Sequence, residues 1–329
     1  MSLGNLFAVL PDEAQTPVGA EVLRGLTAKP RSLSPWLFYD EHGSRLFEQI
    51  TELPEYYLTR TERDLFAAYA PAILAMAAQD SHLTLIELGA GTASKTGLLL
   101  RAALNQQPQL TYRAIDVSAS ALNAARQTLS ESFPTLSIET RVGDYTDGLG
   151  DLPSRKSPNS RRLVLYIGSS IGNFDPDDAR ELLARIRRQL APGDCILLGV
   201  DHVKPLAPLL AAYNDAAGVT AAFNRNILTR INRELGANFH PDRFQHRALF
   251  NAAHSRIEMY LVSTRTQQVS IPALDLDLDF APGETIHTEN SYKFTPESAT
   301  ALLAAGGFTV THSWTDPQHW FGVYLATTI

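Results

Sequence analysis

Residues 85–95 read LIELGAGTASK, and this stretch decides the fold. The apolar residues at its start predict a buried β-strand, and the residues after the glycines predict a helix that begins near Ser94. Gly89 and Gly91 allow the backbone to turn tightly and to approach a ligand closely, because neither has a Cβ atom. The free N–H groups of the following helix would face that ligand at the end of the strand. The stretch therefore predicts a strand, a glycine loop and a helix around a small-molecule site.

The spacing of this loop is E-x-G-x-G, with Glu87 as its acidic residue. A dinucleotide-binding loop carries a third glycine where this chain has Ser94, which disfavours a pyrophosphate ligand. The pattern instead resembles the loop with which class I methyltransferases bind S-adenosylmethionine (SAM). On this motif alone, a nicotinamide-dependent oxidoreductase remains an alternative.

Length and composition indicate a protein of one large domain or two smaller ones. The chain has 329 residues, of which 44% are hydrophobic, and a formal net charge of −7 at pH 7. A negative surface without long basic runs disfavours a nucleic-acid partner. No segment has the roughly 20 apolar residues of a membrane span, and the N-terminus does not resemble a signal peptide. The single cysteine, Cys195, suits a reducing compartment, so we expect a cytoplasmic protein without a membrane partner.

Strand and helix patterns alternate between residues 83 and 200, which is typical of a parallel sheet covered by helices. The expected strands are 83–88, 110–116, 137–142, 162–167 and 195–200, with helices over 94–106, 119–130 and 177–190. A helix over 296–305 and strands over 308–314 and 320–326 would complete this sheet.

Polar side chains follow three of these strands, namely Asp116, Asp144 and Asn173. Ligands of open α/β sheets bind at the carboxyl ends of the strands. Asp116 is placed to accept hydrogen bonds from ribose hydroxyls, and Asp144 is placed to reach an adenine amino group. Together with the glycine loop, these residues predict a SAM site.

After the strand over 195–200 the alternation ends. Residues 205–235 indicate a long helical region, and 256–264 and 267–271 indicate strands with a period of two residues. We expect a smaller α+β unit inserted into the first. The predicted division is 60–202 plus 293–329 for a SAM-binding methyltransferase domain, 17–59 plus 203–292 for a substrate-binding domain, and 1–16 for a flexible tail.

Several segments together resemble the histidine Nα-methyltransferases of ergothioneine biosynthesis. They include WLFYDEHGSRLFEQITELPEYYLTRTE (36–62), ELGAGTASKT (87–96), GSSIGNF (168–174), AYNDAAGVTAAFNRNILTRINRELGANF (212–239) and TENSYKF (288–294). The resemblance runs from about residue 17 to the C-terminus. It implies a SAM-dependent enzyme that trimethylates the α-amine of L-histidine to hercynine. It also implies an α/β fold, a class I SAM-dependent methyltransferase (Rossmann-like) domain with an inserted smaller α+β substrate-binding domain.

The resemblance further implies the residues that bind each ligand. The cofactor side comprises Gly89, Gly91, Lys95, Asp116, Asp144, Tyr145 and Gly168. On the substrate side, Tyr56, Asn173 and Tyr213 hold the α-carboxylate and position the amine, Glu289 and Ser291 hold the imidazole, and Met259, Phe47 and Tyr39 line the pocket. We expect no dedicated general base and no metal, because displacement at a sulfonium methyl depends mainly on positioning.

Glu289 and Ser291 project to the same side of an extended segment. The carboxylate accepts a hydrogen bond from one imidazole N–H, and the hydroxyl can donate to or accept from the second nitrogen. An indole offers one donor only, so the pair favours histidine over tryptophan by about 10- to 100-fold. Relatives in the wider family methylate tryptophan derivatives, so an enzyme for another amino acid such as tryptophan remains an alternative. A non-catalytic SAM-binding module is a further one. We expect a monomer that acts on L-histidine.

Overall fold

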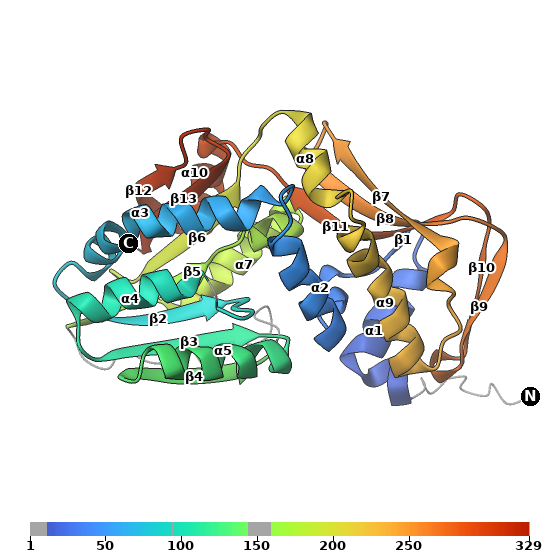
Figure 1. The fold of residues 1–329 in the computed structure, drawn as a ribbon, viewed down its shortest axis with the longest axis horizontal. Helices are drawn as coiled ribbons and strands as arrows, with labels where there is room; N and C mark the ends of the chain where they lie inside the picture. Colours follow the sequence, from blue (N-terminus) through green and yellow to red (C-terminus); the bar gives the residue numbers. More distant parts are fainter. Residues whose placement is uncertain (1–11, 94, 144–158, 329) are drawn as a thin grey trace, which may run out of the picture.

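The computed structural model describes residues 12–93, 95–143 and 159–328 (Figure 1). Its largest element is a seven-stranded sheet of order β12-β13-β6-β5-β2-β3-β4. The strands are β2 (His82–Leu88), β3 (Leu110–Asp116), β4 (Leu136–Val142), β5 (Ser160–Tyr166), β6 (Cys195–Asp201), β12 (Phe308–Thr315) and β13 (Phe321–Thr328). The predicted strands of this sheet are confirmed, with small shifts at their ends.

Helices cover both faces of this sheet. On one face lie α3 (Tyr57–Ala78), α4 (Thr96–Gln106) and α5 (Ala119–Ser132), and on the other lie α7 (Pro176–Gln189) and α10 (Pro296–Ala305). Successive strand residues point to opposite faces, so Leu85 packs with the first group of helices and Ile86 with the second. Both faces are therefore buried, as is usual for parallel sheets.

The order and direction of the strands confirm the predicted fold class. Strands β2, β3, β4, β5 and β6 are parallel, and β13 runs antiparallel to both of its neighbours. This is the sheet of class I SAM-dependent methyltransferases. From β2 the chain adds β3 and β4 on one side of that strand, and it then crosses to add β5 on the other side. The direction of winding therefore reverses between β2 and β5. Ligands of such sheets bind at the carboxyl edge beside this reversal.

A second, four-stranded sheet has the order β1-β11-β8-β7. It consists of β1 (Arg31–Ser32), β7 (Phe244–Asn251), β8 (Arg256–Ser263) and β11 (Thr285–Tyr292), next to a hairpin of β9 (Gln267–Ile271) and β10 (Leu276–Phe280). Its helices are α1 (Pro17–Thr27), α2 (Glu41–Thr51), α8 (Leu206–Tyr213) and α9 (Val219–Leu235). Short 3-10 helices are η1 (Asp12–Gln15), η2 (Pro35–Phe38), η4 (Ser170–Asn173), η5 (Pro241–Arg243) and η6 (Pro272–Leu274). The sequence predicted β8 and β9, whereas β1, β7, β10 and β11 were not assigned as strands.

The chain leaves the seven-stranded sheet after β6 and returns to it after β11, and the two crossings lie side by side. Phe294 N donates to Asp201 O at 2.9 Å, and Val203 N donates to Phe294 O at 2.9 Å. A hydrophobic cluster separate from the core of the seven-stranded sheet surrounds the four-stranded sheet and is built from residues 14–58 and 209–286. This arrangement is compatible with the predicted insertion, and the domain boundaries stay a prediction.

Two further expectations concern the N-terminus and the helices. Residues 12–15, which the sequence placed in a flexible tail, form η1, in which Ala14 is buried. Residues 1–11 lie outside the described part of the chain. None of the described helices is long and apolar enough to cross a membrane.

Candidate active site

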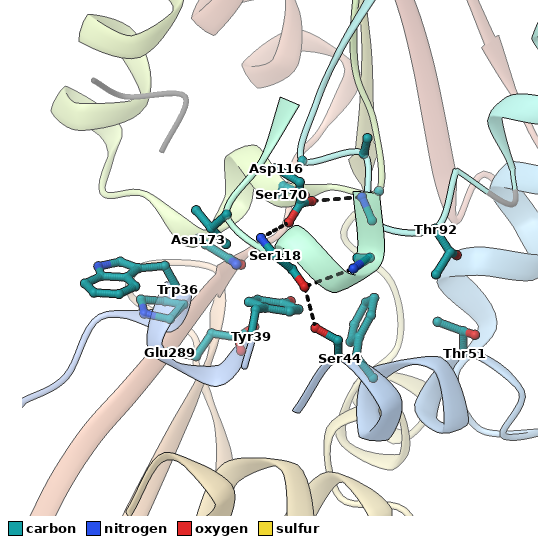
Figure 2. Close-up of a pocket in the computed structure, with 18 of the residues that line it drawn as sticks. Trp36, Tyr39, Ser44, Thr51, Thr92, Asp116, Ser118, Ser170, Asn173 and Glu289 are labelled. Carbon is teal, nitrogen blue, oxygen red and sulfur yellow. Dashed lines mark hydrogen bonds between the residues drawn. The ribbon is translucent and has the colours of Figure 1, made fainter. Parts of the chain in front are cut away.

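A cavity of about 760 Å³ lies at the carboxyl edge of the seven-stranded sheet. One wall is formed by the loops after β2, β3 and β5, and the other by η2, α2 and β11 (Figure 2). Ser44 of α2 and Ser118, which precedes α5, approach to 3.3 Å between their hydroxyl oxygens, so the two walls touch. A second cavity of about 60 Å³ adjoins the first and shares part of its lining, namely Tyr39, Phe47, Tyr56, Asn173 and Glu289. Ligands in the two cavities can therefore meet.

The glycine loop after β2 lines the larger cavity. Gly89 and Gly91 have φ angles of +70° and +53°, in the left-handed region that favours glycine. Gly91 N donates to Asp116 Oδ2 at 2.8 Å, which ties the loop to the end of β3. A Cβ added at Gly91 would meet nothing within 4 Å, so this backbone faces open space. The loop is thus held in shape while its surface stays accessible to a ligand.

Asp116 is the acidic residue at the end of β3, and it is only 9% exposed. Its Oδ1 accepts from Ser118 N at 2.8 Å, in addition to the bond from Gly91. Burial raises the pKa of the carboxyl, and hydrogen bonds from the backbone amides of Ser118, Gly91 and Val117 act against this. A carboxylate has about four lone-pair sites, so acceptor capacity is left for a ligand in the cavity.

Two buried glutamates, Glu62 and the motif residue Glu87, make hydrogen bonds to the segments around this cavity. Glu62 of α3 is fully buried, pairs with Lys95 and accepts from Gly168 N at 2.8 Å. It therefore joins the loop after β2 to the loop after β5. Glu87 accepts from the hydroxyls of Thr96, at 2.7 Å, and Tyr112, and burial raises its pKa to about 7. Sequence reasoning missed Glu62, because α3 gives only a helical pattern.

The predicted residues that the structure describes all line one or both cavities, and those that line both are Tyr39, Phe47, Tyr56, Gly168, Asn173 and Glu289. On the cofactor side, Gly89, Gly91, Lys95, Asp116 and Gly168 line the larger cavity. On the substrate side, the smaller cavity is lined by Tyr39, Phe47, Tyr56, Asn173, Tyr213, Met259, Glu289 and Ser291. Asp144 and Tyr145 lie outside the described residues. The role of each residue stays a prediction.

Glu289 faces the cavities from β11. It lies directly across from Met259 of β8, just after a bulge between His287 and Glu289. Burial raises the pKa of the Glu289 carboxyl to about 7, and the positive charge of Lys293 acts against this. Among the described residues no hydrogen-bond donor reaches this carboxylate, so its oxygens are available to a ligand.

Aromatic rings form one wall of the smaller cavity. Phe47 makes edge-on contacts with Tyr39, at 5.6 Å between ring centroids, and with Tyr56, at 6.2 Å. The helix that carries Phe47 begins at a cap in which Asp40 Oδ1 accepts from Gly43 N at 2.7 Å. Asn226 of α9 donates to the same oxygen at 2.8 Å, which fixes α2 against the four-stranded sheet and its helices.

Three buried charged residues next to the smaller cavity were missed by sequence reasoning, namely Asp201, Lys204 and Lys293. Their side chains are 0% exposed, and both lysines pair with Asp201 at the end of β6. Lys293 lies two residues after Ser291, which lies two residues after Glu289. The alternation of an extended chain places all three side chains on the same side, so this spacing could have predicted that Lys293 lies near the site. Asp201 and Lys204 come from a different part of the chain and offered no such signal.

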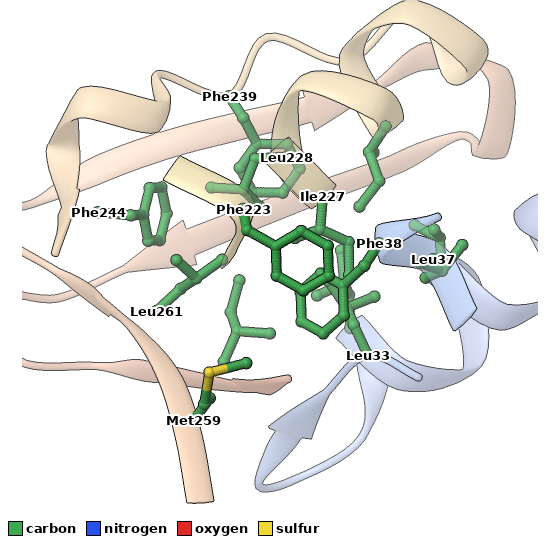
Figure 3. Close-up of a cluster of buried hydrophobic side chains, with 14 of the residues drawn as sticks. Leu33, Leu37, Phe38, Phe223, Ile227, Leu228, Phe239, Phe244, Met259 and Leu261 are labelled. Carbon is green, nitrogen blue, oxygen red and sulfur yellow. The ribbon is translucent and has the colours of Figure 1, made fainter. Parts of the chain in front are cut away.

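The hydrophobic cluster of the four-stranded sheet is drawn in Figure 3. It borders the smaller cavity, because some of its side chains also line that cavity. Phe223 and Met259 belong to both the cluster and the cavity lining. Behind them, Phe244 is 0% exposed and packs edge-on against Phe280 at 5.3 Å between centroids. The shape of the cavity therefore depends on this core.

We expect Phe244→Ala to lower the free energy of unfolding by about 3–5 kcal/mol, because it removes a large buried ring and leaves a void. Urea unfolding followed by circular dichroism measures this loss. Leu206→Ala is the matched control, since Leu206 is 48% exposed, and it should change the unfolding free energy by less than about 0.5 kcal/mol. Equal losses for both variants would contradict the role of this core.

Comparisons with known proteins give consistent results. The sequence model of a family described as "Histidine-specific methyltransferase, SAM-dependent" matches residues 18–328. A histidine N-alpha-methyltransferase of Mycolicibacterium smegmatis is 45% identical, over 99% of this chain and 99% of its own length. One from Mycobacterium tuberculosis is 42% identical, over 96% of each chain. Ergothioneine biosynthesis protein 1 of Neurospora crassa is 31% identical over 90% of this chain, which spans 33% of that longer protein.

Proposed function

This chain belongs to the family of histidine-specific, SAM-dependent methyltransferases, and we propose that it adds three methyl groups to the α-amine of L-histidine, giving hercynine. The methyl donor is SAM. The observation that carries the choice of substrate is Glu289, a carboxylate that receives no hydrogen bond from the part of the chain that the structure describes, beside Ser291 in the smaller cavity. An imidazole ring, with one N–H and one free nitrogen, complements this pair.

The larger cavity fits SAM. Asp116 keeps acceptor capacity toward the cavity, where it would hold the ribose, and the open backbone of Gly91 leaves room for the rest of the ligand. When bound, SAM supplies a methyl group on a positively charged sulfur. Glu62 binds Lys95 and Gly168, which line the same cavity, and this would hold both residues in place for the ligand.

The smaller cavity would hold the amino acid at both ends. Tyr56, Asn173 and Tyr213 would bind the α-carboxylate and position the amine, and Glu289 and Ser291 would hold the ring. Because Tyr56, Asn173 and Glu289 also line the larger cavity, the amine between them would face the methyl donor.

Positioning, rather than proton transfer, is the work of these residues. The neutral amine needs its lone pair in line with the methyl carbon, and holding both reactants in that geometry removes most of the entropic barrier. Water can take the proton released at each round. The chain therefore needs no dedicated general base, and we assign none.

The aromatic wall would accommodate the growing cationic amine. The rings of Tyr39 and Phe47 line the smaller cavity, and aromatic faces attract alkylammonium groups. We expect Phe47→Ala to slow the third methylation more than the first, because only the third transfer forms a permanently charged trimethylammonium group. Single-turnover reactions started from histidine and from its dimethylated form, followed by mass spectrometry, measure this. Equal slowing of all rounds would contradict it.

The proposed function is tested by mass spectrometry on the purified protein incubated with SAM and an equimolar mixture of the twenty amino acids. We expect a mass increase of three methyl groups on histidine alone. Trimethylated tryptophan, or another amino acid, would keep the donor site and overturn the reading of Glu289. Binding of SAM without any methylation would favour a non-catalytic module.

The oligomeric state, the compartment and the absence of a nucleic-acid partner are further parts of the proposed function. We also propose a monomer in the cytoplasm that binds no nucleic acid; the single cysteine suits a reducing compartment, and the formal net charge of −7 disfavours nucleic acid. Light scattering of the purified protein measures the oligomeric state, and a stable dimer would contradict this part of the proposal.

A further inference from the structure

Lys293 occupies a special position between the two sheets. It follows β11 directly, its side chain is 0% exposed, and its Nζ lies 2.9 Å from Asp201 Oδ2 at the end of β6. The same Nζ donates to Ser291 Oγ at 2.8 Å and to Tyr213 OH at 3.0 Å. These three acceptors use all three N–H groups of the ammonium. All hydrogen-bond donors of the lysine are therefore used by protein acceptors. Lys293 does not line either cavity, so it does not itself contact a ligand.

These bonds restrict the two hydroxyl groups. Tyr213 OH and Ser291 Oγ are 2.7 Å apart, so one hydroxyl hydrogen lies between them. Each oxygen already accepts from Lys293, which cannot accept a bond in return. Among the described residues the second hydroxyl hydrogen has no protein acceptor. It is thus left for a ligand in the smaller cavity, which Tyr213 and Ser291 both line.

The direction of the shared bond follows from acidity. A phenolic hydroxyl is more acidic than an aliphatic one, so it is the better donor, and the favoured arrangement has Tyr213 donating to Ser291. Ser291 then holds the free hydrogen, on the same side of β11 as Glu289. The pair Glu289 and Ser291 would offer one acceptor and one donor to a ring.

We propose that Lys293 is a positioning residue that fixes Ser291 as a hydrogen-bond donor, so that the site selects the neutral imidazole ring with its one N–H and one unprotonated nitrogen. This inference rests on the proposed function. Without the lysine, either hydroxyl could turn to accept, and the site would lose its preference for a ring nitrogen that carries a lone pair. The same residue ties β11 to β6, which keeps the ring site in register with the methyl-donor site.

The test compares histidine with the two pyrrolylalanines, which keep the N–H at one or the other ring position and have C–H in place of the acceptor nitrogen. Competition for methylation, read by mass spectrometry, gives the ratio of kcat/KM values, and calorimetry gives the binding constants. We expect the wild type to favour histidine over the better pyrrolylalanine by about 10- to 100-fold, from the cost of leaving a buried donor unpaired. We expect Lys293→Met to reduce this ratio to about 3-fold or less.

Lys204→Met is the matched control. It removes a second buried positive charge from Asp201, but its Nζ contacts Tyr57 OH, Asp201 and His202 O rather than the two hydroxyls. It should therefore keep the wild-type ratio, even if the protein becomes less stable. Lys293→Gln, whose amide can still donate, should retain more of the ratio than Lys293→Met.

The outcomes separate this inference from the proposed function. A wild type that does not methylate histidine overturns the proposed function. If the wild type methylates histidine but Lys293→Met lowers kcat/KM equally for histidine and both pyrrolylalanines, the positioning role is overturned. If Lys293→Met does not fold, Ser291→Ala serves instead. It should abolish the discrimination with Lys293 intact, and retention of the ratio would overturn the inference.

Discussion

Glu289→Gln is expected to lower kcat/KM for histidine by about 10- to 100-fold, mainly by raising KM. The proposed contact is a hydrogen bond from an imidazole N–H to an ionised carboxylate, which contributes about 1.5–3 kcal/mol. A glutamine oxygen can still accept, but without the charge. The loss should be smaller for tryptophan, so the preference for histidine should fall as well. Steady-state kinetics with both amino acids measure the two ratios.

The pH dependence adds a second readout for Glu289. Burial raises the pKa of this carboxyl to about 7, with Lys293 acting in the opposite direction, and the buried hydroxyls of Tyr56 and Tyr213 face the same group. The carboxylate must be ionised to act as a charged acceptor, and a raised pKa moves the loss of that form to higher pH. The advantage of the wild type over Glu289→Gln should therefore be full well above pH 7, decline as the pH falls through about 7, and be lost well below it. The titrations of histidine itself are common to both proteins and cancel in the ratio.

A matched control for Glu289 is Asp277→Asn. Asp277 is an exposed carboxylate on β10, away from both cavities. It should leave kcat/KM for histidine unchanged. A Glu289→Gln enzyme within about 3-fold of the wild type would contradict the assignment of Glu289 to the ring, given the strength expected of a charge-assisted hydrogen bond.

Asp116→Ala is expected to weaken SAM binding by at least about 100-fold, since two hydrogen bonds from ribose hydroxyls to a carboxylate are lost. The same substitution removes the acceptors of Gly91 N and Ser118 N, both at 2.8 Å. The glycine loop would then lose its tie to the end of β3. Isothermal titration calorimetry with SAM and with S-adenosylhomocysteine measures the effect directly, without requiring turnover.

The control for this experiment is Asp64→Asn, a substitution of an exposed carboxylate on α3. Circular dichroism of both variants checks that the fold is retained. Binding of SAM within about 3-fold of the wild type by Asp116→Ala would contradict the proposed ribose contact, since the loss of even one such bond exceeds that factor. Histidine binding in the absence of SAM should be affected much less, because Asp116 does not line the smaller cavity.

The seven-stranded sheet could be predicted because its central strands β2, β5 and β6 are rich in buried apolar residues and its strands alternate with helices along the chain. Of β11, the sequence indicated only the extended segment around Glu289 and Ser291, because the bulge between His287 and Glu289 shifts the phase of the alternation along the rest of the strand. Thr288 is fully buried on one side of the bulge, and Ser291 is buried on the other, so no single period of two residues fits the whole strand. The strand β7, FQHRALFN, mixes polar and apolar residues without a regular period.

For the candidate site, local motifs were predictable and distant partners were not. The glycine loop and Asp116 form a pattern within one β-α-β unit, so their proximity follows from the topology. Glu62 and Lys293 act on residues that are far away in sequence, namely Gly168 and Asp201. A buried charge pair of this kind becomes visible only when the chain is folded.

The adjacency of the two crossings, at His202 and Phe294, bears on how such an enzyme can evolve. The segment between them begins just after the end of β6 and ends at Phe294. His202 and Phe294 pair in a parallel β-bridge, so the two ends of the segment are neighbours. Chain inserted at such a point can be lengthened or replaced with little displacement of the host sheet, because the ends stay where they were. A lineage can therefore change the part of the amino-acid pocket that this segment supplies, from Tyr213 to Ser291, while the loops that line the methyl-donor site are inherited unchanged.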